Sequence, residues 1–507
     1  MFNTILVANR GEIAIRIMRA CRELGTKSIA VYSEADQESL HVGYADESYC
    51  IGPAPPTQSY LNIDKILEIA QLSGSEAIHP GYGFLAQIPA FAKACEANNL
   101  EFIGPSSTVL QVMGDKVKAR KAMNDVGIPV IPGSTKPAED EHEVEELAET
   151  LGYPILIKAV FGGGGKGLRV ANSDADVAKA MELVHLEAET SFGSSKIYVE
   201  KLFAEPRHIE FQLLADKNGN VIQLGERECS IQRRYQKLIE ETPSPMMTDN
   251  LRVRMAAAAI RAAESIEYTS AGTIEYLVDR NGDFYFLEMN TRLQVEHLIT
   301  ELVTGVDLVK EQIRIATGEE LRYRQDEIVA RGHALNCRIN SEDPYSDFAP
   351  CPGTITKYRP PGGPGVRVDA ALYSGYTIPI FYDSLIAKLA VWGATRDEAI
   401  LRMKNALGEY VIEGVETTIP YHLKILEDEQ FRRGRIHTEF IHERIGNLAI
   451  EKRVQDEEVA ALSVALAAQL LNRREDLAVI PRRKAEGASA WKMAGRREWV
   501  RSRVERA

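Results

Sequence analysis

A stretch near the middle of the chain contains two acidic residues whose spacing predicts that they face each other. Residues 273–290 form two strand-like runs on either side of Asn281-Gly282, a dipeptide typical of tight β-hairpins. If these two residues form the loop, Glu275 lies directly opposite Glu288 in the ladder. The sequence therefore predicts two carboxylates on one face of a hairpin.

Two facing carboxylates repel each other unless a positive group lies between them. Asn290 lies two residues beyond Glu288, so its side chain shares that face. Two carboxylates with an amide oxygen suit Mg²⁺, which proteins hold with one or two carboxylates plus substrate phosphates. The alternative is an exposed sheet face with solvated charges, which a one-residue slip in register would produce.

A second group of polar side chains follows the hairpin at once. Arg292, Gln294 and Glu296 alternate, so an extended segment would place them on the face that Glu288 and Asn290 share. A carboxylate beside a guanidinium and a metal site suits an anionic substrate and a general base. An ordinary salt-bridged surface strand is the alternative. Glu296 and the next residue form no HExxH motif, so a zinc site is not indicated.

A run of glycines at 162–165 has Lys158 and Lys166 on its two sides. Consecutive glycines can bring backbone N–H groups against phosphate oxygens, and the lysines favour a mobile flap over phosphates. The spacing does not match a Walker P-loop, and no GxGxxG follows the first strand-like run. A glycine run by itself can also be only a flexible loop.

Three further segments carry polar groups that are weaker signals. The first is the cluster 232–237, followed by two glutamates, and the second is Arg207-His208 before the alternating run 209–214. The third, 79–84, follows a strand-like run, where open α/β sheets place ligands. A tight turn with a packed tyrosine would explain the third equally well.

The elements that must hold these residues differ along the chain. The first 110 residues alternate between strands (4–8, 28–32, 76–78, 101–104) and helices (12–24, 63–72, 88–97), which predicts a parallel sheet covered by helices. Residues 114–334 are rich in β-like stretches with two helices, 116–126 and 251–266. Residues 335–446 mix strands with Pro/Gly turns and end in a helix at 396–410.

Composition narrows the class of protein. The 507 residues carry a formal net charge of −13, which argues against nucleic-acid binding by bulk charge. No apolar run approaches the roughly 18 residues of a membrane helix, and residues 1–8 do not resemble a signal peptide. The six scattered cysteines form no CxxC, so we expect a reducing cytoplasm rather than a disulfide scaffold.

The segment from about residue 447 differs again. Residues 457–472 are rich in Ala and Leu and predict a helix. Residues 482–507 hold nine basic and three acidic residues, so this end is +6 where the rest of the chain is −19. The basic end could dock a partner subunit or be a solvated helix. Lys492 lies in an Ala-Trp-Lys-Met context that departs from the Met-Lys-Met of a biotinylated lysine, and we expect an ordinary lysine.

Taken in order, the motifs closely resemble the biotin carboxylase subunit of multisubunit biotin-dependent carboxylases, an ATP-grasp family. The similarity runs from about residue 5 to about 444. It includes VANRGEIAIRIMRACRELG, HPGYGFL, MGDK at 113–116, GGGGKG, CSIQRRYQK, EMNTRLQVEH, RINSEDP and FYDSLIAKLAVWG. The early part looks most like the biotin carboxylase subunits of archaeal-type pyruvate carboxylases, and acyl-CoA carboxylase relatives are also similar.

The resemblance implies an α/β and α+β architecture in four parts. These are a Rossmann-like domain (1–114), an ATP-grasp domain (115–334) with a mobile lid at about 131–203, a mixed C-terminal domain (335–446) and a helical basic tail (447–507).

The resemblance also implies roles for single residues. ATP contacts are expected from Lys116, Lys158, Gly163, Gly164, Gly165, Glu200, Lys201, His208, Gln232, Glu275 and Glu288. The metal site, for two Mg²⁺ or Mn²⁺ ions, would use Glu275, Glu288 and Asn290. The bicarbonate pocket would be formed by Lys237, Arg292, Gln294, Val295 and Glu296, and the biotin end by Tyr82 and Arg338. Arg16, Arg19 and Glu23 match positions associated with a dimer face or carrier approach.

The implied reaction is carboxylation of biotin. Glu296 removes the bicarbonate proton while Arg292 fixes the anion, and the oxygen attacks the γ-phosphorus of MgATP. Carboxyphosphate then gives CO₂ and phosphate, the phosphate takes the N1′ proton of biotin, and Arg338 stabilises the enolate-like biotin. Biotin would arrive on a carrier protein, with carboxyltransferase subunits on separate chains, and the chain would form a homodimer in the cytoplasm.

Several positions depart from the family pattern. They are Gln87 with its neighbours, Phe161 in the glycine loop, Tyr235, Leu298 and Asn336. Two other functions stay open at this point: another ATP-grasp ligase of the carbamoyl-phosphate or purine carboxylase type, and a non-catalytic scaffold subunit. Intact Glu275, Glu288, Glu296 and Arg338 argue against the scaffold.

Overall fold

The computed structural model describes residues 1–134, 136–138, 140–160, 167–192 and 196–445. The predicted helix at 457–472, Lys492 and the basic end therefore lie outside the described residues, as do Phe161 and Gly163 to Gly165. Residues Met1–Leu448 belong to one compact unit. Within the described part of the chain, no helix is both long and apolar enough to span a bilayer.

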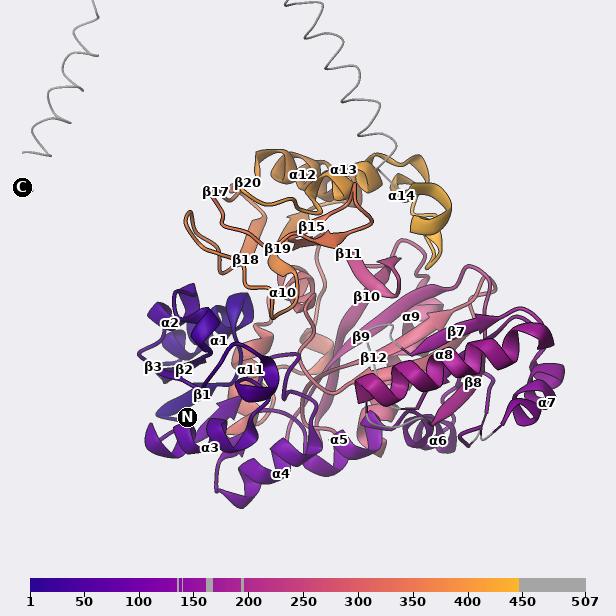
Figure 1. Ribbon diagram of the computed structural model, residues 1–507, viewed down its shortest axis with the longest axis horizontal. Coiled ribbons are helices and arrows are strands. Elements are labelled where there is room, and N and C mark those ends of the chain that lie inside the picture. Colours follow the sequence, from indigo (N-terminus) through magenta and orange to yellow (C-terminus); the bar gives the residue numbers. More distant parts are fainter. Residues whose placement is uncertain (135, 139, 161–166, 193–195, 446–507) are drawn as a thin grey trace, which may run out of the picture. The chain divides into compact units, whose positions relative to one another are not determined.

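The N-terminal part is a parallel five-stranded sheet in the order β3-β2-β1-β4-β5 (Figure 1). Its strands are β1 (Thr4–Val7), β2 (Lys27–Tyr32), β3 (Glu47–Cys50), β4 (Ala77–His79) and β5 (Glu101–Phe102). The helices are α1 (Gly11–Glu23), α2 (Leu40–Tyr44), α3 (Ile63–Leu72) and α4 (Pro89–Ala97), with short 3₁₀ turns η1 (Glu34–Asp36) and η2 (Pro56–Gln58). The alternation of strands and helices predicted this sheet, but β3 and α2 were not predicted.

The order of these strands places two loops side by side. Strands β1 and β4 are neighbours, so the loops after their carboxyl ends meet at the point where the strand order reverses. Asn9, after β1, donates from its amide to the carbonyls of Pro80 and Tyr82, both at 2.7 Å. One side chain therefore fixes the loop that carries Tyr82.

The centre of the molecule is an eight-stranded antiparallel sheet in the order β13-β12-β9-β10-β11-β14-β19-β18. Its strands are β9 (Arg207–Ala215), β10 (Val221–Arg233), β11 (Gln236–Thr242), β12 (Ser270–Val278), β13 (Phe284–Asn290), β14 (His333–Asn340), β18 (Val366–Ala370) and β19 (Leu385–Gly393). Because β11 pairs with β14, one sheet continues across the boundary predicted at residue 335.

Helices cover this sheet and connect its strands. They are α5 (Ser107–Gly114), α6 (Lys116–Asp125), α9 (Asp249–Ser265), α10 (His297–Thr304), α11 (Leu308–Ala316), α12 (Arg396–Glu409), α13 (Ile419–Glu427) and α14 (Glu429–Arg432). Short elements complete the C-terminal part: β15 (Glu342–Asp343), β16 (Ala349–Pro350), β17 (Lys357–Arg359), β20 (Val411–Glu413), the turn η3 (Gln325–Glu327) and the π-helical turn η4 (Ile441–Ile445).

A separate three-stranded sheet, ordered β7-β6-β8, lies within residues 131–203. It consists of β6 (Ile155–Ala159), β7 (Leu168–Ala171) and β8 (Ile197–Lys201), with α7 (Glu141–Leu151) and α8 (Asp174–Phe192) packed against it. Ile155, Ile157 and Val199 are fully buried in its own apolar core. The expectation of only two helices between 114 and 334 was wrong, because α7, α8, α10 and α11 also lie there.

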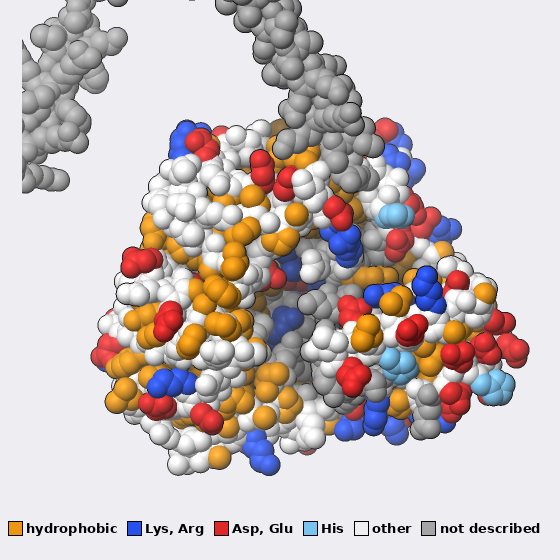
Figure 2. Space-filling model, viewed as in Figure 1, with side chains coloured by type: hydrophobic (Ala, Val, Ile, Leu, Met, Phe, Trp, Pro, Cys, Tyr) orange, Lys and Arg blue, Asp and Glu red, His pale blue; other side chains and the backbone are white. Residues whose placement is uncertain are grey.

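Viewed as a surface, the molecule is hollowed near the centre of one face (Figure 2). Blue and red side chains are visible inside the hollow, between the N-terminal elements, the C-terminal elements and α8.

Candidate active site

The predicted pair of acidic residues is present, although the loop that was expected to produce it is different. Asp279 pairs with Asp283, so the hairpin loop has three residues, 280–282, and Gly282 takes the left-handed conformation (φ +84°). Leu287 is an extra residue in a bulge between Phe286 and Glu288. The bulge compensates for the longer loop, and Glu275 lies opposite Glu288 as expected.

The two carboxylates also share one space. The amide nitrogen of Asn290 lies 2.8 Å from Glu275 Oε1 and 3.4 Å from Glu288 Oε1. All three side chains therefore lie on the same face and within reach of one small group. Their oxygens form the hard donor set that Mg²⁺ or Mn²⁺ prefers, so these residues fit a divalent cation.

Glu275 is the centre of this cluster. Its carboxylate accepts hydrogen bonds from His208 (2.7 Å), Lys237 (2.9 Å), Asn290 (2.8 Å) and Gln294 (2.8 Å). Burial alone would raise the pKa of Glu275, but the charges of Lys237 and His208 outweigh it and hold the pKa well below its ordinary value. Glu275 is therefore ionised at neutral pH.

Sequence reasoning missed a third carboxylate in the same row. Glu210 on β9 lies directly opposite Glu275 on β12, and Lys237 donates to both, at 2.6 Å to Glu210. Arg227 on β10 also donates to Glu210, at 2.5 Å. The signal was available, because Glu210 alternates with His208 along the predicted strand 209–214.

Lys237 continues from this row to Glu296. Its ammonium lies 2.8 Å from Glu296 Oε1, and the other oxygen of Glu296 lies 3.0 Å from Arg338 Nη2. Glu296 is fully buried. Burial would raise the pKa of Glu296, yet the charges of Lys237 and Arg338 hold it below its ordinary value. The carboxylate is thus ready to accept a proton.

Arg338 is held by a second carboxylate, Glu240, one of the two glutamates after the cluster 232–237 to which no role was assigned from the sequence. Its Nε donates to Glu240 Oε1 at 2.6 Å. The other oxygen of Glu240 accepts from Asn336 at 2.7 Å. Asn336 is one of the departures from the family pattern, and its neutral amide satisfies Glu240 without adding charge.

The segment after the hairpin is a loop, and the expectation of a continued extended strand was wrong. Its three polar side chains still reach the site. Arg292 donates to Asn290 Oδ1 (2.9 Å), Gln294 Oε1 (3.0 Å) and Gln87 Oε1 (2.7 Å). Burial lowers the pKa of Arg292. Glu296 directly precedes α10 at its N-cap position, and Val295 lies partly exposed between Gln294 and Glu296.

A second group of cations lies on the lid side. Glu200 on β8 is buried and binds Lys158 and Arg120, each at 2.5 Å. Burial and the charge of Lys158 lower the pKa of Lys116, while Glu288 and Glu200 act in the opposite direction. Lys158 is therefore held by Glu200, and Lys116 is the first residue of α6.

Two further residues predicted to contact ATP, Gln232 and Lys201, lie in different sheets. Gln232 is buried and lies directly opposite Lys237 on the neighbouring strand. Lys201 directs its ammonium to the carbonyl of Gly152 at 2.7 Å, and its backbone N–H donates to Pro132 at 2.8 Å. The side chain of Lys201 is thus hydrogen-bonded within the lid segment and does not join the Glu200–Lys158 group.

At the opposite end, Tyr82 lies in the loop fixed by Asn9, and its hydroxyl donates to the carboxylate of Glu12. Two further departures from the family pattern lie elsewhere. Tyr235 is 41% exposed at the β10–β11 turn with φ +63°, and Leu298 is fully buried in α10. None of these side chains displaces a member of the charged cluster.

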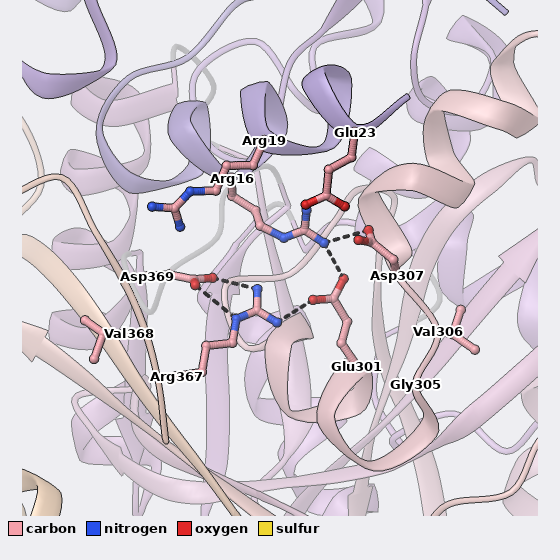
Figure 3. A pocket seen from close by; sticks show the side chains of 10 residues that line it. All are labelled: Arg16, Arg19, Glu23, Glu301, Gly305, Val306, Asp307, Arg367, Val368 and Asp369. Carbon is pink, nitrogen blue, oxygen red and sulfur yellow. Dashed lines mark hydrogen bonds and ion pairs between the residues drawn. The ribbon is translucent and has the colours of Figure 1, made fainter. Parts of the chain in front are cut away.

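Arg16, Arg19 and Glu23 do not approach this site. They line a polar pocket of about 350 Å³ beside Arg367 and Asp369 (Figure 3). Arg16 donates to Asp307 at 2.6 Å and Glu301 at 2.9 Å. These three residues therefore belong to a separate charged surface.

Family models match most of the chain. They are "Biotin carboxylase, N-terminal domain" at residues 1–110, "Carbamoyl-phosphate synthase L chain, ATP binding domain" at 115–324 and "Biotin carboxylase C-terminal domain" at 336–443. The central model is shared with the rival ligase that the sequence left open. The two flanking models favour biotin carboxylase over that rival.

Similar proteins give the same result. A pyruvate carboxylase subunit of Methanothermobacter thermautotrophicus is 56% identical, with 94% of this chain and 100% of the relative covered. Biotin carboxylase 1 of Bacillus subtilis is 53% identical, with 87% and 98% covered.

Solved structures agree with these relatives. The biotin carboxylase domain dimer of Hydrogenobacter thermophilus 2-oxoglutarate carboxylase, in complex with MgADP, ADP and bicarbonate, is 48% identical with a TM-score of 0.86; 87% of this chain and 98% of that chain are covered. The biotin carboxylase β,γ-ATP complex of Campylobacter jejuni is 46% identical with a TM-score of 0.86, and the coverage is 88% and 99%.

These findings confirm the fold class and the enzyme class expected from the sequence, an ATP-dependent ligase with an ATP-binding domain between two further domains. The pyruvate carboxylase subunit and biotin carboxylase 1 are each matched over nearly their whole length, and both flanking family models are those of biotin carboxylase. The chain therefore belongs to the biotin carboxylase family.

Proposed function

We propose that this chain uses ATP and bicarbonate to carboxylate biotin carried on a separate protein, as the first half-reaction of a pyruvate or acyl-CoA carboxylase. One observation carries the proposal. The ionised carboxylate of Glu296 lies between Lys237 and Arg338, with the Glu275–Glu288–Asn290 cluster on the other side of Lys237. A base, an anion pocket and a cation site are thus contiguous.

In this proposal the bicarbonate anion binds against Arg292, Gln294, Val295 and Lys237. Arg292 is already oriented by hydrogen bonds to three side chains, which lowers the entropic cost of fixing the anion. Glu296 removes the bicarbonate proton, since its low pKa keeps it ionised. The resulting oxygen attacks the γ-phosphorus of ATP, the bond to the β,γ-bridging oxygen breaks, and carboxyphosphate forms as ADP leaves.

The phosphate groups of ATP would lie between Lys116 and Lys158 on the lid side and His208 and Gln232 on the central sheet. The charges of the two lysines and the polar side chains of His208 and Gln232 support this position. The Glu200 carboxylate orients Lys158. Lys201 and the glycines 163–165 complete the proposed set of ATP contacts. Glu275, Glu288 and Asn290 would hold Mg²⁺ or Mn²⁺, which neutralises phosphate charge when bound.

Biotin would enter at the end of the site formed by Tyr82 and Arg338. There the phosphate released from carboxyphosphate takes the N1′ proton, and the guanidinium of Arg338 stabilises the enolate-like biotin as it captures CO₂. Arg338 also contacts Glu296. Deprotonation of bicarbonate by Glu296 and carboxylation of biotin beside Arg338 would therefore occur at neighbouring positions.

We assign the parts of the chain accordingly: 1–114 as the N-terminal domain, 115–334 as the ATP-grasp domain with its lid at 131–203, 335–446 as the C-terminal domain, and the basic segment 447–507 as a contact with another protein chain. Carrier and carboxyltransferase subunits would be separate chains in the cytoplasm. The surface with Arg16, Arg19 and Glu23 would form a homodimer contact. A biotin carboxylase domain dimer among the similar structures supports a dimer.

The test is incorporation of labelled bicarbonate into free biotin or a biotinylated carrier by the purified chain with MgATP. The proposal expects acid-labile label in biotin, with one ADP formed for each carboxylated biotin at saturation. Label transferred to another acceptor while biotin stays unlabelled would favour the rival ligase, and absence of ADP formation would favour a scaffold.

A further inference from the structure

The two residues at the proposed biotin end come from distant parts of the chain. Tyr82 follows β4 in the N-terminal sheet, whereas Arg338 lies on β14 in the central sheet. Neither residue is hydrogen-bonded to the other in the described structure. Something else must fix their separation if both are to contact one small ring.

Lys388 on β19 lies next to both. It is directly opposite Arg338 in the antiparallel β14–β19 pair, so the two side chains project from the same face of the sheet. Its ammonium also lies 5.6 Å from the centre of the Tyr82 ring, within the range of a cation–π contact. A single side chain is therefore a neighbour of both residues of the proposed biotin end.

Glu12 completes the connection. It lies in the first turn of α1, where the helix dipole favours a carboxylate. One of its oxygens lies 3.0 Å from Lys388 Nζ, and the other accepts the Tyr82 hydroxyl. The tyrosine is thus held at its ring by Lys388 and at its hydroxyl by Glu12.

Both charged groups are deeply buried. Lys388 is 0% exposed and Glu12 is 6% exposed. Burial raises the pKa of Glu12 to about 7, although the charge of Lys388 lowers it. Asp369 lies 3.8 Å from Lys388. Asp369 also binds Arg367 at 2.8 Å, and Figure 3 draws this pair. The lysine is therefore shared by two carboxylates from different elements.

A buried ion pair is a poor way to gain stability, because an apolar pair of similar size usually does as well. Its directional contacts can, however, fix the position of a third group. We propose that Glu12 and Lys388 are positioning residues that hold the Tyr82 side chain at a set distance from Arg338 and so shape the biotin subsite. The inference rests on the proposed function, because it needs Tyr82 and Arg338 to be the biotin end.

A purely structural role would have a different consequence. Glu12 and Lys388 also join α1 to β19, so losing the pair could loosen the packing of these elements. Such loosening would lower stability and affect all substrates alike. A positioning role instead predicts a selective effect on biotin.

The first experiment measures steady-state kinetics with free biotin for Glu12→Gln and Lys388→Met. We expect KM for biotin to rise about tenfold or more, since each change removes a contact to a charged group. KM for ATP and for bicarbonate should change less than about twofold. The control is Arg396→Met, which breaks the buried pair of Arg396 and Glu241 (2.7 Å) away from Tyr82. It should lower thermal stability and leave KM for biotin unchanged.

The second experiment is a double-mutant cycle with Tyr82→Phe, which removes only the hydroxyl. If Glu12 acts through Tyr82, the double variant Glu12→Gln/Tyr82→Phe should have the same kcat/KM for biotin as the worse single variant. Additive losses, or an unchanged KM for biotin in folded variants, would overturn the inference. The cycle needs only conservative changes, so it remains informative if Lys388→Met does not fold.

The wild-type chain separates this inference from the function it rests on. Wild-type turnover that does not depend on biotin would reject the proposed function. Biotin-dependent wild-type turnover with no selective change in these variants would reject only the positioning role.

Discussion

Glu296 Oε2 lies 3.0 Å from Arg338 Nη2, while Glu296 Oε1 lies 2.8 Å from Lys237 Nζ. The carboxylate thus joins Arg338, the group proposed to handle biotin, to Lys237, which contacts the proposed metal-binding cluster. Because both neighbours are cations, the proton affinity of the buried carboxylate stays low enough for it to be ionised. The loss of either cation should therefore change proton transfer as well as binding.

The proposed metal site can be tested at Glu288. Glu288→Gln keeps the size of the side chain and removes one anionic oxygen from the cluster. We expect the Mg²⁺ concentration needed for half-maximal rate to rise roughly tenfold or more, because loss of groups that only support a metal ligand already costs about 10–100-fold in affinity or activity. Titration of the rate with free Mg²⁺ at saturating ATP measures this.

Asp283→Asn is the matched control, since Asp283 is an exposed carboxylate in the same hairpin. It should leave the Mg²⁺ dependence unchanged. An equal shift in both variants would mean that general charge, rather than ligation by Glu288, sets the requirement.

Gln87, one of the departures from the family pattern, provides a test of the proposed bicarbonate pocket. Its oxygen accepts from Arg292 Nε at 2.7 Å, and its amide donates to Thr291 at 3.3 Å. Gln87→Leu removes the acceptor, so we expect KM for bicarbonate to rise about tenfold or more, in line with a hydrogen bond to a charged group. Initial rates at varied bicarbonate check this.

Gln87→Glu restores an acceptor at the same place and should return KM for bicarbonate to within a few-fold of the wild-type value. A Leu variant with unchanged KM for bicarbonate would show that Arg292 needs no support from this loop.

Acid stability is expected to depend on Glu241. Burial would raise the pKa of Glu241, but His333 at 2.7 Å and Arg396 at 2.7 Å lower it to about 2. Since the ordinary value is 4.5, the folded state gains stability from this carboxylate above pH 4.5 and loses it as pH falls towards 2. The shift corresponds to about 3 kcal/mol at neutral pH.

Urea unfolding of Glu241→Gln between pH 7 and pH 3 measures this contribution. The variant should be less stable at pH 7 and should show a shallower loss of stability on acidification than the wild type. Parallel curves for the two proteins would show that Glu241 does not contribute to acid unfolding.

Local patterns were sufficient to predict the parallel N-terminal sheet except for its edge strand β3, and the face of the hairpin. Alternating strands and helices specify parallel pairing, and the period of two along strands specifies which residues share a face. Glu275 and Glu288 were paired correctly even though the turn was not, because the bulge at Leu287 cancelled the extra loop residue. The bulge itself has no short-range signal.

The remaining partners depend on contacts between segments distant in the sequence. Arg338 faces Lys388, and Lys237 reaches Glu210, because separate strands pair in one particular register. A sequence read one segment at a time does not contain that register. Glu12, Glu240 and Lys388 were therefore not assigned to the site, although each carries a charge into the interior. Glu210 was missed for another reason, because its alternation with His208 was not followed along the predicted strand.

The most direct test of the central claim is the rate of carboxylbiotin formation by Glu296→Ala, measured beside the affinity for MgATP. We expect a rate lower by several orders of magnitude with MgATP affinity within a few-fold of wild type, because the base is lost while the nucleotide contacts remain. A Glu296→Ala variant that carboxylates biotin at a near-normal rate would contradict that claim.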